Sequence, residues 1–132
     1  VMNNEFIVGA EAQKLLNLLV EEVDVAIVVT VTGRKMLTSI IKQENEEVEY
    51  RVSAMTAAIM NVIEDMSAEF FGAKTYDSDT LIQISKGILG KIIIASLNVS
   101  TILLLAVNQS DFNKNVVLDI IYRLKNIVPS SW

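Results

Sequence analysis

Residues 88–107, ILGKIIIASLNVSTILLLAV, constrain the fold of this chain more than any other stretch. Fourteen of these twenty residues are apolar and the stretch carries one charge, Lys91, and twenty residues is the length at which a helix can cross a bilayer. Its polar residues, however, gather between positions 96 and 101, where they would lack hydrogen-bond partners in lipid. Two aliphatic runs separated by Asn-Val-Ser are instead typical of neighbouring strands that are buried on both faces. The stretch therefore predicts a hairpin inside a protein core, and we expect no direct membrane insertion.

Two terminal segments have the apolar spacing of helices that could cover such strands. Residues 5–23 repeat leucine and valine at steps of three and four, which is typical of an amphipathic helix. Residues 111–128 do the same, with Ser110 or Asp111 as the expected N-cap and Pro129 as the stop. Both ends of the chain are therefore expected to be helical.

Three further strands are predicted outside the opening stretch. The run 25–31 is rich in β-branched residues and is separated by Thr-Gly-Arg from a second short apolar run, 36–41. This pattern favours a hairpin with a glycine-containing turn. Residues 80–86, TLIQISK, alternate in part and predict another short strand.

The longest predicted helix covers residues 46–71, with Asn45 as its N-cap and Gly72 at its C-terminal end. We interpret the acidic residues at its start, Glu46, Glu47 and Glu49, as a solvated first turn favoured by the helix dipole. A continuous apolar stripe on this helix has the spacing needed to cover a sheet; its members are Val48, Val52, Met55, Ile59, Val62, Ile63, Met66 and Phe70. Small and apolar residues, Ala54, Ala57, Ala58 and Met60, widen that stripe around the side of the helix.

A helix that is apolar over so wide an arc is expected to be buried on two sides. In a chain of 132 residues, the second side can be covered by another copy of the protein. The alternative is that the alanines serve only as good helix formers.

The composition excludes several classes of function. The chain has no cysteine and no histidine, so thiolate or imidazole metal sites and Cys–His or Ser–His catalysis are excluded. The segment VTGRKMLTS lacks the spacing of a phosphate-binding loop, and Asp77 and Asp79 are interpreted as part of a solvated turn. We expect no catalytic residue, no cofactor and no metal. A formal charge of −5 without a basic cluster argues against nucleic acid as a partner.

Three segments together resemble the roadblock/LC7 family of dynein light-chain-like and GTPase-associated proteins. They are LLNLLVEEVDVAIVVTVTG, in which a helix runs directly into a strand, the central helix RVSAMTAAIMNVIEDMSAEF, and the three-strand run TLIQISKGILGKIIIASLNVSTILLLAV. The resemblance covers nearly the whole chain and predicts a single domain over residues 1–132 with a core at about 10–128. The fold class that it implies is α+β, an α/β sandwich of order α-β-β-α-β-β-β-α, with a five-stranded antiparallel sheet. The long helix would cover one face of that sheet and the terminal helices the other.

The resemblance also implies a function, a non-catalytic dimeric scaffold that binds and regulates a Ras-like small GTPase or a motor or signalling complex. Its partner in the dimer would be itself or a paralogous roadblock protein, through paired long helices and joined third strands. The interface expected on this basis comprises Val52, Ala54, Met55, Ala58, Ile59, Val62, Ile63 and Met66 of the central helix and Leu81, Gln83 and Ser85 of the following strand. Arg34 and Arg51 are candidate contacts to the GTPase. The most specific role for either residue is that of an arginine supplied in trans to the GTPase active site, where it stabilises the transition state of GTP hydrolysis.

A cytoplasmic location is expected because the chain lacks cysteine and its N-terminus does not have the pattern of a signal peptide. The alternative function is a small-molecule sensor of similar sheet-and-helix architecture. Such a sensor needs a cavity with a few polar groups in apolar walls, and the aliphatic runs leave no obvious polar residue pointing inward.

Overall fold

The computed structural model describes residues 2–40, 46–72, 80–108, 112–129 and 131–132. Three helices and five strands follow one another in the order α-β-β-α-β-β-β-α, as the sequence predicts. They are α1 (Met2–Leu19), β1 (Val25–Thr30), β2 (Lys35–Ile40), α2 (Glu46–Phe71), β3 (Leu81–Ser85), β4 (Lys91–Ser96), β5 (Thr101–Val107) and α3 (Lys114–Ile127).

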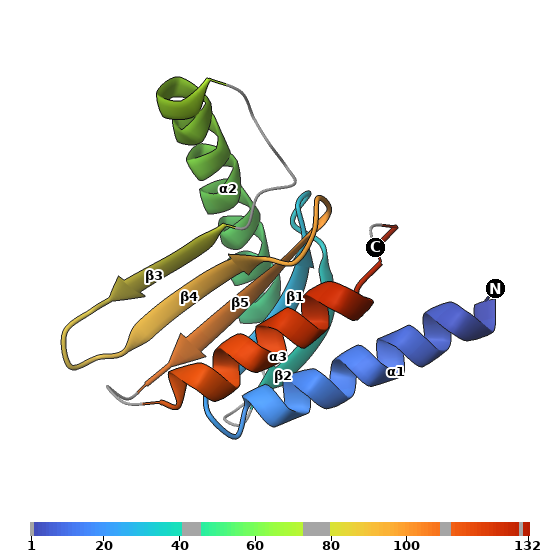
Figure 1. Cartoon of the computed structure of the whole chain (residues 1–132). Coiled ribbons are helices and arrows are strands. Elements are labelled where there is room, and N and C mark those ends of the chain that lie inside the picture. Colours follow the sequence, from blue (N-terminus) through green and yellow to red (C-terminus); the bar gives the residue numbers. More distant parts are fainter. Residues whose placement is uncertain (1, 41–45, 73–79, 109–111, 130) are drawn as a thin grey trace.

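The five strands form one antiparallel sheet in the order β2-β1-β5-β4-β3. The central strand β5 pairs with β1 on one side, from Val25 opposite Ala106 to Thr30 opposite Thr101, and with β4 on the other. Helices α1 and α3 lie together on one face of the sheet and α2 lies on the opposite face (Figure 1). Strands β1, β4 and β5 are thus covered on both faces over most of their length, which explains their continuous aliphatic sequences.

Alternate residues of these strands supply two separate cores. The larger core packs Leu16 and Leu19 of α1 and Leu124 of α3 against Val28 and Leu103 and their neighbours on that face of the sheet. The smaller core lies under α2 and consists of Ile27, Val29, Met60, Ile94, Ile102 and Leu104. The unequal sizes mean that α2 is held by fewer apolar contacts than the pair of terminal helices.

The stretch 88–107 is a hairpin tip followed by β4 and β5, which confirms the interpretation of its sequence. Within the described residues, no helix is long and apolar enough to cross a membrane. The predicted bounds of the central helix, 46–71, are also confirmed. Gly72 adopts a positive φ of 97° and donates its N–H to the carbonyl of Ala68 at 3.0 Å, as expected of a residue that ends a helix. Its predicted N-cap, Asn45, lies outside the described residues.

The ends of both terminal helices differ from the prediction, since α1 begins at Met2 and not at residue 5, and α3 ends at Ile127 and not at residue 128. α1 stops at Leu19 and not at residue 23, because the chain turns through residues 20–24 so that the Asp24 N–H can donate to the Ala106 carbonyl beside β1. α3 is capped by Asn113, whose side chain accepts from the Val116 N–H at 3.3 Å, and not by Ser110 or Asp111.

Candidate interaction surface

Helix α2 turns most of its large apolar side chains away from the sheet, and only Val52 and Met60 of them pack against the core beneath it, which corrects the prediction that the apolar stripe covers the sheet. The residues buried beneath the helix are mostly small or polar: Glu49, Ser53, Thr56, Ala57 and Met60. The hydroxyls of Ser53 and Thr56 are accommodated because each donates to a backbone carbonyl one turn earlier, that of Glu49 at 2.7 Å and that of Val52 at 2.6 Å. The more apolar side of α2 therefore faces solvent, and its side of mostly small and polar residues faces the sheet; we call this arrangement inverted.

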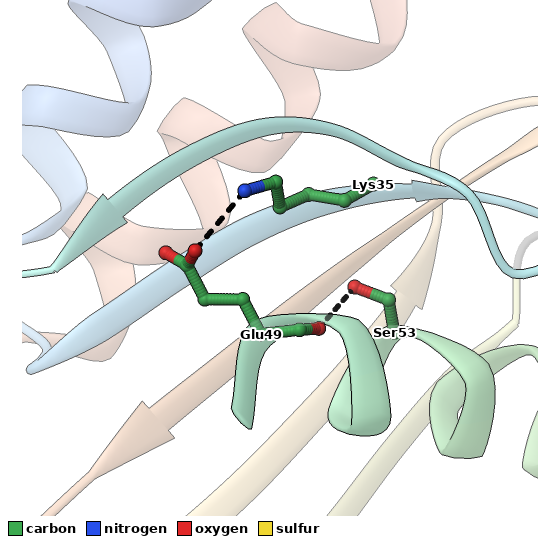
Figure 2. Close-up of polar contacts among 3 residues, drawn as sticks. All are labelled: Lys35, Glu49 and Ser53. Atoms are coloured by element: carbon green, nitrogen blue, oxygen red, sulfur yellow. Dashed lines mark hydrogen bonds and ion pairs between the residues drawn. The ribbon is translucent and has the colours of Figure 1, made fainter. Parts of the chain in front are cut away.

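The first turn of α2 is fastened to β2 by an ion pair (Figure 2). The Lys35 ammonium lies 3.0 Å from Glu49 Oε2, and the side chains are only 17% and 5% exposed. The same ammonium lies 5.1 Å from the centre of the Tyr50 ring, which adds a cation–π contact. The interpretation of Glu49 as part of a solvated turn is therefore wrong, because it is buried and paired.

The exposed side of α2 carries an apolar seam, which we define as Val48, Val52, Met55, Ile59, Val62 and Met66. All except the half-buried Val52 are more than a third exposed, and Met55 reaches 58%. Successive members are four, three, four, three and four residues apart. This is the spacing by which two helices pack along a common seam.

The sheet face next to α2 is also incompletely covered. α2 lies over β1, β2 and β5, whereas Ile84 of β3 and Ile92 of β4 are both about 40% exposed. These two residues are directly opposite each other in the β3–β4 ladder. They lie two residues along each strand from the pair Ile82–Ile94, which packs in the core under α2. Because alternate strand residues share a face, Ile84 and Ile92 extend that apolar face beyond the helix.

Strand β3 forms one edge of the sheet among the described residues. Four of its five residues are exposed and Ile82 is half-buried. An exposed, uncharged edge strand presents unpaired backbone groups to any second strand. The seam of α2, Ile84 and Ile92, and the β3 edge together make up the candidate interaction surface.

The residues predicted for a dimer interface lie on this surface. Met55, Ile59, Val62 and Met66 are exposed members of the seam, Ala54 and Ala58 are exposed beside it, and Val52 and Ile63 are half-buried. Leu81, Gln83 and Ser85 are exposed on β3. The sequence reasoning missed Ile84 and Ile92, although their cross-strand apolar pairing could have indicated them.

The two arginines predicted to contact a partner are both exposed and lie near one another in the fold. Arg34 is in the β1–β2 turn and Arg51 is in the second turn of α2. The turn packs against the helix, since a Cβ built on Gly33 would lie 3.4 Å from Ala54 Cα, one helical turn after Arg51.

A pocket of about 300 Å³ opens between α2 and the β4–β5 turn. Its walls combine Met60 and Ile102 with Asn61, Glu64 and Asn98. Polar groups therefore do line a cavity, contrary to the expectation from the aliphatic runs. The Asn98 side chain is already engaged, because its Oδ1 accepts from Ser100 and Thr101 at 2.8–2.9 Å and its Nδ2 donates to the Val128 carbonyl. Across the described part of the chain, acidic side chains form no cluster that could hold a metal ion.

Comparison with solved structures places this arrangement among known folds. MglB from Myxococcus xanthus superposes with a TM-score of 0.69 at 9% identity, over 88% of this chain and 89% of that one. A roadblock/LC7 domain from Streptomyces avermitilis gives 0.68 at 10% identity, over 86% and 91%. The chain has the roadblock/LC7 fold.

The gliding protein MglB from Thermus thermophilus agrees, with a TM-score of 0.70 at 10% identity over 91% of this chain and 87% of that one. No family model matches the sequence, and no curated protein matches it either. The roadblock/LC7 resemblance seen in the sequence is therefore confirmed through the fold.

Proposed function

We propose that this chain is a non-catalytic dimeric scaffold that binds and regulates a Ras-like small GTPase or a motor or signalling complex. The observation that supports it best is the inverted helix α2, whose seam faces solvent while small and hydroxyl-bearing residues face the sheet. Burying one Val, Ile or Met side chain contributes about 1.5–3 kcal/mol. The five exposed residues of this seam form a large apolar surface for a monomer, and the helix-pairing spacing indicates a second helix as the occupant.

The GTPase or assembly partner is proposed from the roadblock/LC7 resemblance, and the exposed Arg34 and Arg51 are the contacts proposed for it. The solved neighbours add that one MglB structure has a tetrameric arrangement, so a chain of this fold can assemble with copies of itself. A paralogous roadblock chain would use the same seam as a second copy.

Light scattering over a hundredfold concentration range, without detergent, tests the dimer. A species of twice the 14.6 kDa chain mass is expected, and Val62→Asp in the seam should convert it to a monomer. Leu118→Asp is the matched control, because Leu118 is an exposed leucine on α3 at the opposite face. A wild-type monomer at every concentration would refute the homodimer and leave a paralogous chain as the partner.

Capture experiments with Ras-like GTPases, loaded with GDP or a GTP analogue, test the second half of the proposal. The dimer should retain at least one GTPase, and Arg34→Ala or Arg51→Ala should weaken that binding without changing the dimer mass. Retention of none from a broad panel, by a verified dimer, would contradict the GTPase role.

A small-molecule sensor is the second candidate, and the pocket beside α2 is the observation in its favour. A metabolite that raises the thermal unfolding temperature of the wild type but not of Asn61→Leu would support it. If no metabolite of a broad panel raises the thermal unfolding temperature, the sensor function is refuted. The result of the light-scattering test of the dimer does not depend on this outcome.

A further inference from the structure

Two exposed apolar clusters remain outside the interaction surface described above. The first is the tip of the β3–β4 hairpin, where Ile88 is 97% exposed and Leu89 72%. The second is the C-terminal end of α2, where Phe70 and Phe71 are 76% and 83% exposed with ring centres 6.3 Å apart. Paired bulky side chains at this level of exposure mark a contact with another molecule.

The hairpin tip holds its two apolar side chains on a defined turn. The Lys86 N–H donates to the Gly90 carbonyl at 2.9 Å, and the Leu89 N–H donates to the Lys86 carbonyl at 3.0 Å. Gly87 and Gly90 both have positive φ, and a Cβ added at Gly90 would collide with the Val107 carbonyl oxygen of β5. Ile88 and Leu89 are therefore presented on a tight, backbone-bonded turn.

The charges beside the two clusters are opposite in sign. Lys86 and Lys91 flank the hairpin tip, but the Lys91 ammonium lies 5.4 Å from the centre of the Phe112 ring on the α3 side of the sheet, which leaves Lys86 as the cation beside the tip. The end of α2 carries Asp65 and Glu69 and has no basic residue in its last turn, so the negative end of the helix dipole is not offset there. The hairpin tip, an apolar pair next to a cation, and the end of α2, an apolar pair next to anions, therefore complement each other: both are apolar and their charges are opposite.

The two clusters of one copy do not meet. Figure 1 shows the C-terminal end of α2 projecting past the sheet, away from the β3–β4 tip at the far end of β3. A second copy of this chain offers the complementary cluster. The symmetry of the dimer must then bring the hairpin tip of one copy to the end of α2 of the other.

The geometry of the interaction surface selects such a symmetry. Burying the β3 edge and the α2 seam in one two-fold interface requires both α2 helices on the same side of a shared sheet. Only an axis perpendicular to the sheet does this, and it makes the two β3 strands antiparallel. An axis parallel to the strands would place the helices on opposite faces. With antiparallel strands, the tip that follows β3 of one copy approaches Leu81, where β3 of the other copy begins, and α2 projects past the sheet toward that end of β3 (Figure 1).

We infer that Ile88 and Leu89 of each copy pack against Phe70 and Phe71 of the other, with Lys86 facing Asp65 and Glu69. This contact rests on the proposed dimer and deepens it, because it occurs twice and closes the interface at both ends. It also sets the register of the shared strands, which backbone pairing of β3 by itself leaves open.

Cross-linking tests the contact directly, because the chain has no native cysteine. Leu89→Cys and Phe71→Cys are produced in one cell with different tags and treated with a short bismaleimide. A cross-link between the two tags is expected. Leu89→Cys with Tyr122→Cys, an exposed aromatic residue on α3, is the negative control. Gln83→Cys, in the middle of β3, should cross-link to itself and serves as the positive control for strand pairing.

Charge exchange gives a second readout. Lys86→Glu and Glu69→Lys should each raise the dimer dissociation constant about fivefold, and the double variant should recover most of the affinity. Ile88→Ser with Leu89→Ser should weaken the dimer further.

The outcomes separate this contact from the dimer itself. A dimer in which Gln83→Cys cross-links but the 89–71 pair does not, and in which charge exchange has no effect, overturns the contact and leaves the dimer standing. A monomeric wild type overturns both. Binding of the wild type to vesicles containing phosphatidylserine that is lost with the two serines, while the dimer is unchanged, assigns the tip to a lipid surface instead.

Discussion

Replacing Gly90 by alanine should destabilise the protein far more than the same change at Gly87, three residues away in the same turn. A Cβ at Gly90 would overlap the Val107 carbonyl oxygen and would lie 3.2 Å from Asn108 Cα, and Gly90 has a φ of 143°. At Gly87, with a φ of 55°, nothing lies within 4 Å of the added atom. The two substitutions therefore share a left-handed backbone but differ in whether the backbone of β5 must move.

The expected cost follows from these contacts. An alanine in an unfavourable region of φ costs about 1–3 kcal/mol. Moving β4 away from Val107 disrupts the last pair of the β4–β5 ladder and the Lys86–Gly90 hydrogen bond, at about 1 kcal/mol each. We expect Gly90→Ala to lower the free energy of unfolding by about 3–5 kcal/mol, and Gly87→Ala by about 1 kcal/mol.

Urea unfolding followed by circular dichroism measures both values at one fixed protein concentration, because a dimer makes stability concentration-dependent. A difference of less than about 1 kcal/mol between the two variants, which is less than one lost backbone hydrogen bond contributes, would refute the predicted displacement of β5 by Gly90→Ala. A Gly90→Ala loss that comes with a changed urea slope would point to altered native compactness.

Three further substitutions test the other features. Lys35→Met should cost about 3 kcal/mol of unfolding free energy because it removes the cation paired with the buried Glu49 carboxylate, and Lys35→Met with Glu49→Leu should recover most of it in a denaturation double-mutant cycle. Asn98→Ala should cost about 2–4 kcal/mol, since the buried Thr101 hydroxyl loses its acceptor; Asn98→Asp, which keeps the acceptor, should cost less in the same assay. Val62→Asp should remove the concentration dependence of the thermal unfolding temperature that we expect of the wild type, and a persisting dependence would count against the seam.

The order of elements could be predicted from the sequence because each has a strong local signal. The bounds of α2 follow from an apolar period that ends at Gly72, and the β4–β5 hairpin follows from aliphatic runs broken by Asn-Val-Ser. The ends of these helices also involve contacts between distant segments, which local spacing does not contain: the Asn113 N–H donates to Glu22 Oε2 at 3.1 Å, and the Asp24 N–H donates to the Ala106 carbonyl.

The orientation of α2 could not be predicted for a different reason. Apolar spacing identifies which residues form an apolar surface. It does not say whether that surface packs against the same chain or against another chain. Met55 and Val62 are more apolar than Ser53 and Thr56, so they were assigned to the sheet, whereas the structure places the hydroxyls there and satisfies them on the helix backbone. The expectation from apolar spacing that this stripe covers the sheet is therefore wrong, whereas its assignment to a dimer interface stays a prediction.

The central place of β5 in the sheet has a consequence for how the chain is made. β5 separates β1 from β4, and its pairing with β1 joins residues 25–30 to residues 101–106. A ribosome must therefore synthesise most of the chain before β1 of the β1–β2 hairpin can pair with β5. Until then the other edge of β1, made of Val, Ala and Ile residues, is open, and unpaired apolar edges of this kind aggregate. Chains truncated before Thr101 should consequently fail to fold and depend on chaperones, whereas loss of α3 would leave every strand pairing available.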